Sequence, residues 1–255
     1  MRRNPVCLRI SQQPCLSQRG LVWEANPFLG WRGIRLTRDR RALLSTQVRA
    51  ILRVGADILL PMMSSLEELR RAKAVIAEAG GRTARVGVMI ETPAAVTIAP
   101  ALAREMSFFS IGSNGLVQYV MAADRTNPRV AQIADPFQPA VLCLLKQTAE
   151  AGREAGIDVA LCGELAADPL ATPLLIGMGI DELSVSAPFI PDLKQAIAGW
   201  SLQEARQISE QALHLDSVAA VRNFLAEAGR RDGIRPDDVR EPFYLTDVFN
   251  VDDIR

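Results

Sequence analysis

Short apolar runs alternate along the chain with longer segments in which apolar residues recur every three to four positions. Continuous apolar runs are typical of strands buried on both faces, and the longer period is typical of amphipathic helices. The expected strands are residues 29–36, 57–62, 86–91, 108–113, 158–163 and 182–187. The expected helices are residues 39–54, 65–81, 93–106, 138–155 and 169–178, with further helices from residue 191 onwards.

Two local signals define helix boundaries. Ser65 and Glu68 have the spacing of a capping box, and the helix that they begin should close at the glycine pair 80–81. Pro93 suits a helix N-terminus, whereas Pro100 predicts a break or kink inside residues 93–106.

Strands that alternate with helices predict right-handed βαβ units and therefore an α/β fold with a parallel sheet. The repeat of roughly 20–50 residues favours a (β/α)₈ TIM barrel, and an open doubly wound sheet is the alternative. No G-x-G-x-x-G follows a first strand, which disfavours a dinucleotide-binding version. Only six strands are expected where a barrel has eight, so we predict an incomplete barrel with C-terminal helices; residues 1–25 could add at most one weak strand.

Composition bears on the possible partners, the location and the metal content of the protein. The 255 residues are 49% hydrophobic, enough for a sizeable core. Lys plus Arg and Asp plus Glu both number 29, so no nucleic acid or membrane partner is expected. Without an apolar run of about 18 residues or a signal peptide, we expect a cytoplasmic protein. Four cysteines without a CxxC pair, and a single histidine, do not favour a zinc site.

Polar residues follow several of the expected strands, where the active sites of barrels lie. They include Arg32, Glu91, Asn114 and Cys162. Arginine binds carboxylate or phosphate in a bidentate manner, a carboxylate can hold a divalent cation, and a thiol can donate a proton. This combination predicts a small substrate that bears both phosphate and carboxylate.

Six segments, in this order, resemble one family: ANPFLGWRGIRL, ILLPMMSSLEEL, VGVMIETPAA, FFSIGSNGLVQYVMAADR, LCGELAADP and DELSVSAPFIP. The family is the C-terminal phosphoenolpyruvate-binding barrel of enzyme I of the bacterial sugar phosphotransferase system, which is also found in pyruvate phosphate dikinase and phosphoenolpyruvate synthase. The resemblance implies that phosphoenolpyruvate binds with Mg²⁺, that its phosphoryl group passes to a protein histidine, and that the remaining enolate is protonated to pyruvate.

The resemblance also implies a role for each site residue. Arg32, Asn114 and Arg125 correspond to substrate-binding residues. Glu91 corresponds to a Mg²⁺ ligand, and Cys162 to the general acid that protonates the enolate. These roles make physical sense, because developing negative charge requires fixed positive groups and a carbanion requires a nearby proton.

The sequence departs from the family pattern in three ways. The usual GTNDL motif reads GSNGL, so Gly115 replaces the second Mg²⁺ ligand and a weakened metal site is expected. Residues 1–25 lack the arginine motifs of the family's first strands, and His214 lies outside any phosphohistidine motif. We therefore expect a truncated copy of a phosphoenolpyruvate-protein phosphotransferase whose activity is impaired as this chain alone.

The expected organisation is an atypical segment over residues 1–25, the barrel over 26–213, and a C-terminal helix and polar tail over 214–255. The expected partners are phosphoenolpyruvate and pyruvate, a histidine-bearing phosphocarrier domain or protein, and a second copy in a homodimer. Two other functions stay open. One is a non-catalytic dimerisation or ligand-binding module; the other is a lyase or aldolase acting on a pyruvate enolate, which would require both metal carboxylates.

Overall fold

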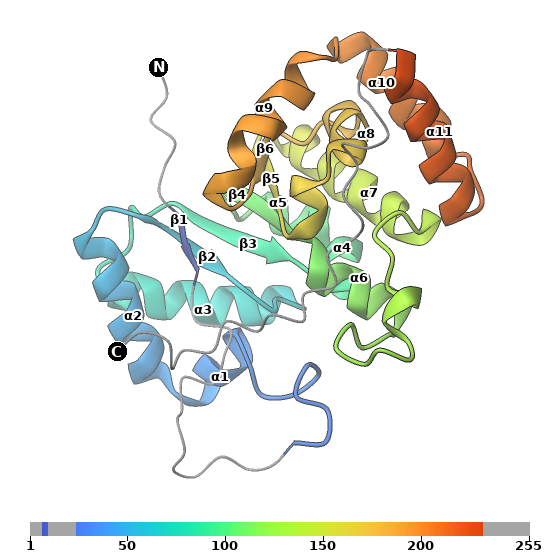
Figure 1. The fold of residues 1–255 in the computed structure, drawn as a ribbon. Helices are drawn as coiled ribbons and strands as arrows, with labels where there is room; N and C mark the ends of the chain where they lie inside the picture. The colour runs from blue at the N-terminus through green and yellow to red at the C-terminus, as the bar shows by residue number, and fades with distance from the viewer. Residues whose placement is uncertain (1–6, 10–23, 232–255) are drawn as a thin grey trace.

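The computed structural model describes residues 7–9 and 24–231, and within them the strands form one parallel sheet (Figure 1). The strands are β1 (Cys7–Arg9), β2 (Asp57–Leu60), β3 (Val86–Ile90), β4 (Phe108–Gly112), β5 (Asp158–Cys162) and β6 (Glu182–Ser184). Their order in the sheet is their order along the chain, and every neighbouring pair is parallel. This confirms the α/β class. In the described part of the chain, β1 and β6 are the two edges of the sheet, so a closed barrel is not seen.

Helices connect successive strands and extend the chain beyond β6 (Figure 1). Those up to β6 are α1 (Ile34–Asp39), α2 (Arg41–Arg53), α3 (Leu66–Glu78), α4 (Pro93–Thr97), α5 (Ala99–Ala103), α6 (Ser113–Met121), α7 (Pro139–Ala155) and α8 (Thr172–Met178). After β6 come α9 (Ile190–Ala198), α10 (Leu202–Ala212) and α11 (Val218–Arg231). No helix of the described residues has the length and apolar character needed to cross a bilayer.

The prediction of a strand over residues 29–36 is wrong. The segment forms tight turns, with the Leu29 amide donating to the Asn26 carbonyl, and then enters α1. Gly33 ends the turn with a φ of +57°, a left-handed conformation that glycine adopts without strain. The sixth strand is instead β1, which lies in the segment where the sequence allowed one weak strand.

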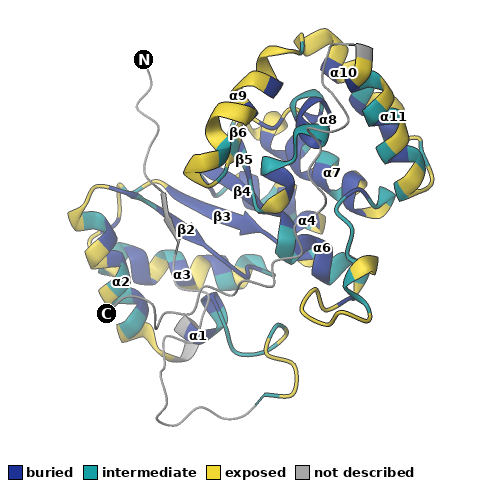
Figure 2. Cartoon of the chain, in the orientation of Figure 1, coloured by how far each residue is buried: buried dark blue, intermediate teal, exposed yellow. Residues whose placement is uncertain are grey.

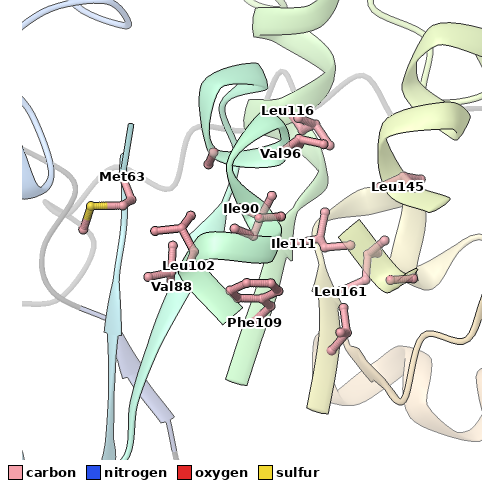
Figure 3. Packing of buried hydrophobic residues seen from close by; sticks show 14 of the residues in the cluster. Met63, Val88, Ile90, Val96, Leu102, Phe109, Ile111, Leu116, Leu145 and Leu161 are labelled. Carbon is pink, nitrogen blue, oxygen red and sulfur yellow. The ribbon is translucent and has the colours of Figure 1, made fainter. Parts of the chain in front are cut away.

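The remaining strands lie where the apolar runs predicted them, and both faces of the sheet are covered at β2, β3 and β4. The side chains of Ile58, Val88, Phe109 and Leu161 pack with the helices in the main core, of which Figure 3 shows part. Leu59, Met89 and Phe108 form a second cluster, against which Cys162 packs. The alternation of side chains along the central strands thus separates two apolar faces, and Figure 2 shows β2, β3 and β4 as largely buried.

The helix signals are largely confirmed. The hydroxyl of Ser65 accepts from the amide of Glu68, and the Glu68 carboxylate accepts from Ser64 rather than from Ser65 as a full capping box requires. The break predicted from Pro100 falls at Ile98, between α4 and α5. Most of segment 1–25 and the part of the tail after residue 231 lie outside the described residues.

Candidate phosphoenolpyruvate-binding site

A cavity of about 370 Å³ opens beside the carboxyl ends of β3, β4 and β5. Its lining contains all five residues that the sequence singled out, together with position 115: Arg32, Glu91, Asn114, Gly115, Arg125 and Cys162. These residues are far apart in the chain and are brought together because parallel strands end at the same edge of the sheet. The structure therefore gathers the candidate groups in one place, while their roles remain predictions.

Glu91 is fixed at the end of β3 before any ligand arrives. Its side chain is only 5% exposed, and one carboxylate oxygen accepts from the backbone amide of Met62 at 2.8 Å. Met62 has a φ of 59°, which is uncommon for a residue with a side chain. A Cβ atom at Gly115 would lie 2.8 Å from the other oxygen, Oε2. That oxygen therefore faces the position where the family carries its second carboxylate.

Asn114 forms a reciprocal pair with Glu164, which follows β5. Its Oδ1 accepts from the Glu164 amide at 3.1 Å, and its Nδ2 donates to Glu164 Oε1 at 3.2 Å. Partial burial raises the pKa of the Glu164 carboxyl, while the charge of Arg125 and the Asn114 hydrogen bond oppose this shift. Asn114 is thus held in a single orientation at the cavity wall.

Cys162 is a half-buried thiol at the end of β5. Its Sγ lies 3.8 Å from the Ser110 hydroxyl oxygen, and its carbonyl accepts from the Ser113 hydroxyl at 2.8 Å. The next residue, Gly163, has a φ of +108°, and a Cβ there would lie 2.3 Å from Ser113 Oγ. A larger residue would therefore push the loop away from α6. Cys143, by contrast, is exposed on α7 and outside the cavity lining.

Two arginines bring positive charge to the cavity from irregular segments. The Arg32 guanidinium lies over the Phe28 ring, 5.0 Å from its centroid, and its buried Nε has no hydrogen-bond partner among the described residues. Arg125 lies in the loop that follows α6. Arg35, the other arginine of the motif GWRGIR, donates instead to the Leu29 and Gly30 carbonyls, outside the lining.

Comparison with known proteins shows to which family the chain belongs. The family model described as "PEP-utilising enzyme, PEP-binding domain" matches residues 1–202. The chain belongs to this family. It is 42% identical over 226 residues to the phosphoenolpyruvate-protein phosphotransferase of Haemophilus influenzae, covering 83% of this chain and 39% of that protein. The phosphotransferase of Bacillus subtilis is 39% identical, with 80% of this chain and 38% of that protein covered.

The chain therefore spans about two fifths of the length of these relatives. Two solved structures are also similar in part: RipC from Yersinia pestis and a citrate lyase from Burkholderia xenovorans. Both have a TM-score of 0.47, with 14% and 17% sequence identity. Each comparison covers 76% of this chain; the covered share of the other chain is 76% for RipC and 70% for the citrate lyase.

The cavity of this PEP-binding domain contains few acidic side chains. Glu91 is the single carboxylate side chain in the cavity lining, and within the described ranges no three His, Cys, Asp or Glu residues are grouped to hold a metal ion. One of its oxygens is already engaged by Met62, and Gly115 supplies no ligand. The cavity thus offers a Mg²⁺ ion the carboxylate of Glu91, where the resemblance led us to expect two acidic residues.

The sequence interpretation missed several lining residues of this PEP-binding domain, namely Phe28, Met89, Gln118 and Tyr119. The Tyr119 hydroxyl donates to the Phe28 carbonyl and so ties α6 to the segment that carries Arg32. Burial raises the pKa of Tyr119, and the charge of Arg32 opposes the shift. The spacing of four residues between Asn114 and Gln118 could have indicated that both lie on one helix face at the cavity.

Proposed function

We propose that the cavity binds phosphoenolpyruvate, and that the chain is the phosphoenolpyruvate-binding domain of a phosphoenolpyruvate-protein phosphotransferase. That reaction transfers the phosphoryl group to a protein histidine and releases pyruvate. The observation that carries the proposal is that Arg32, Glu91, Asn114, Arg125 and Cys162 line one cavity. The family membership and the names of the relatives support it.

The roles follow from the chemistry of each group. Arg32 and Arg125 offer guanidinium donors to the phosphate and carboxylate oxygens. Asn114 adds a neutral amide whose orientation is already fixed by Glu164. When the phosphorus–oxygen bond breaks, the electron pair stays with the enolate; its terminal carbon then takes the proton of the Cys162 thiol, giving pyruvate and a thiolate that water reprotonates.

Magnesium would be held here by Glu91 together with the phosphate of the substrate. A bound Mg²⁺ ion would supply neutralising charge to the transferring phosphoryl group. Mg²⁺ is bound in many sites by one or two carboxylates plus substrate phosphate, so a single carboxylate supports a weakened site rather than none. We expect the affinity for the metal to depend on the presence of phosphoenolpyruvate.

The wider setting is also part of the proposal. The consecutive parallel order of the strands supports six units of a (β/α)₈ barrel. The reaction requires a histidine-bearing phosphocarrier domain or protein as acceptor. A homodimer and a role in sugar transport follow from the family resemblance, a cytoplasmic location follows from the sequence, and all three stay predictions.

A non-catalytic ligand-binding or dimerisation module is the second candidate, and Gly115 is the observation that favours it. With one carboxylate missing from the metal site, the cavity could retain anion binding while phosphoryl transfer is lost. Phosphoenolpyruvate binding without any pyruvate release to a histidine-bearing phosphocarrier would support this module. Pyruvate release at a rate typical of enzymes would reject it.

Calorimetric titration with phosphoenolpyruvate and Mg²⁺ tests the binding proposal. Arg125→Gln removes a charged hydrogen-bond donor and should weaken binding by about 10- to 150-fold. Arg129→Gln is the matched control, because Arg129 is exposed in the same loop but outside the lining. No heat with the native chain at millimolar ligand, or equal affinities for both variants, would contradict the proposal.

A further inference from the structure

Gln118 is a buried polar side chain at the cavity for which the proposed roles give no use. It lies in α6 with 7% of its surface exposed, and it is one of the residues that line the cavity. Among the described residues, its Oε1 is buried and has no hydrogen-bond partner. A buried amide oxygen left unpaired costs free energy, so packing alone does not account for a glutamine here.

The position of Gln118 on the helix relates it to the ligand-binding groups. It follows Asn114 by four residues, so both side chains lie on the same face of α6. Arg32 Nε is a second buried atom without a partner among the described residues, and Arg32 lines the same cavity. Two lining residues thus each carry a buried polar atom without a partner, which is expected where a ligand completes the hydrogen bonds of the site.

We propose that Gln118 is a further ligand-contacting residue, whose side-chain amide donates a hydrogen bond to an anionic oxygen of phosphoenolpyruvate. This inference rests on the proposed function. Phosphoenolpyruvate in its anionic form offers only acceptors, so the amide contacts it through its NH₂ group, the donor of this side chain. The contact adds a donor without adding charge, and it selects ligands that present an acceptor at this point.

The chain provides a matched control in Gln47. Its Oε1 is likewise buried without a partner in the described part of the chain, but Gln47 lies in α2 and not in the cavity lining. Gln→Met preserves approximate length and removes the polar atoms. Gln118→Met and Gln47→Met should both leave the unfolding temperature unchanged or higher, because each removes an unsatisfied buried group. Only Gln118→Met should alter ligand affinity.

The experiment is calorimetric titration of both variants and the native chain with phosphoenolpyruvate, accompanied by thermal unfolding without ligand. We expect Gln118→Met to weaken binding about tenfold or more, and Gln47→Met to leave it unchanged. Gln118→Glu, which keeps the shape but offers only acceptors and a negative charge, should weaken binding further.

Equal affinity of Gln118→Met and the native chain would overturn this inference and leave the proposed function intact. Loss of the fold in Gln118→Met but not in Gln47→Met would assign a structural role to Gln118 and would also overturn it. If the native chain itself binds no phosphoenolpyruvate, the proposed function fails, and the inference fails with it.

Discussion

A carboxylate added at position 115 would face Glu91 directly, and Gly115→Asp is therefore the most informative change at this site. A Cβ atom at this position would lie 2.8 Å from Glu91 Oε2 and 3.2 Å from Glu91 Cβ. The nearer atom is the end of a flexible side chain, although the Met62 amide holds its other oxygen. The variant should fold, with two carboxylates side by side in place of one.

The magnitude follows from opposing effects. Two like charges about 4 Å apart repel by about 4 kcal/mol at an effective dielectric of about 20, and less where water enters the cavity. Replacing a helical glycine with aspartate, itself a poor helix former, returns only about 0.3 kcal/mol, and a carboxylate in the first turn of α6 about 0.3–1 kcal/mol. Without metal, we therefore expect destabilisation by about 1–3 kcal/mol, or a fall of about 2–12 °C in the unfolding temperature.

Magnesium should reverse this loss. An ion present at a hundred times its dissociation constant stabilises the folded state by about 2.7 kcal/mol, which corresponds to a rise of about 5–11 °C. The assay is thermal unfolding with and without Mg²⁺, and Gly115→Asn is the control of nearly the same shape without the charge. If Gly115→Asp and Gly115→Asn respond equally to Mg²⁺, the assignment of Glu91 and position 115 to a metal site is refuted.

Three further experiments test other parts of the structure. Phosphoenolpyruvate should protect Cys162, but not the exposed Cys143, from alkylation measured by mass spectrometry; equal protection of both thiols would place the ligand elsewhere. Burial raises the pKa of Asp168, so its contribution to stability is present at low pH and lost as the pH rises through that pKa. The unfolding temperature of Asp168→Asn should therefore increase relative to that of the native chain as the pH rises from about 3 to about 7. A difference in unfolding temperature that does not change with pH would argue against the raised pKa of Asp168. Ser65→Ala should cost about 0.5–2 kcal/mol in urea unfolding, because it removes the N-cap of α3; no change would show that the cap is not needed.

The sequence predicted five strands. For β2, β3 and β4 the apolar run reflects burial on both faces, which is visible in residue type, whereas β6 was found although its residues are exposed or only partly buried. It failed at residues 29–36, where Leu29 and Trp31 imitate strand alternation. There the chain turns instead of extending, because Gly33 takes a left-handed conformation, and Leu29 is 64% exposed rather than buried as a strand residue would be. The three residues of β1 were too short an apolar run to recognise.

The site was predicted where it follows from topology, since Glu91, Asn114 and Cys162 come directly at or after strand ends. Gln118 and Tyr119 were missed because their placement depends on how α6 leaves β4 and packs. The hydrogen bond from Tyr119 to Phe28 joins residues 91 positions apart, which no local pattern reveals. Motif resemblance likewise located Arg125, whose loop carries no periodic signal.

The position of the cavity within the sheet has a consequence for local opening. It lies at the ends of β3, β4 and β5, each of which is paired with a strand on both sides. Edge strands exchange their amide hydrogens through smaller openings than central ones, so β1 and β6 can fray while the central three stay closed. Deuterium uptake should accordingly slow from the borders of the sheet toward the ligand pocket.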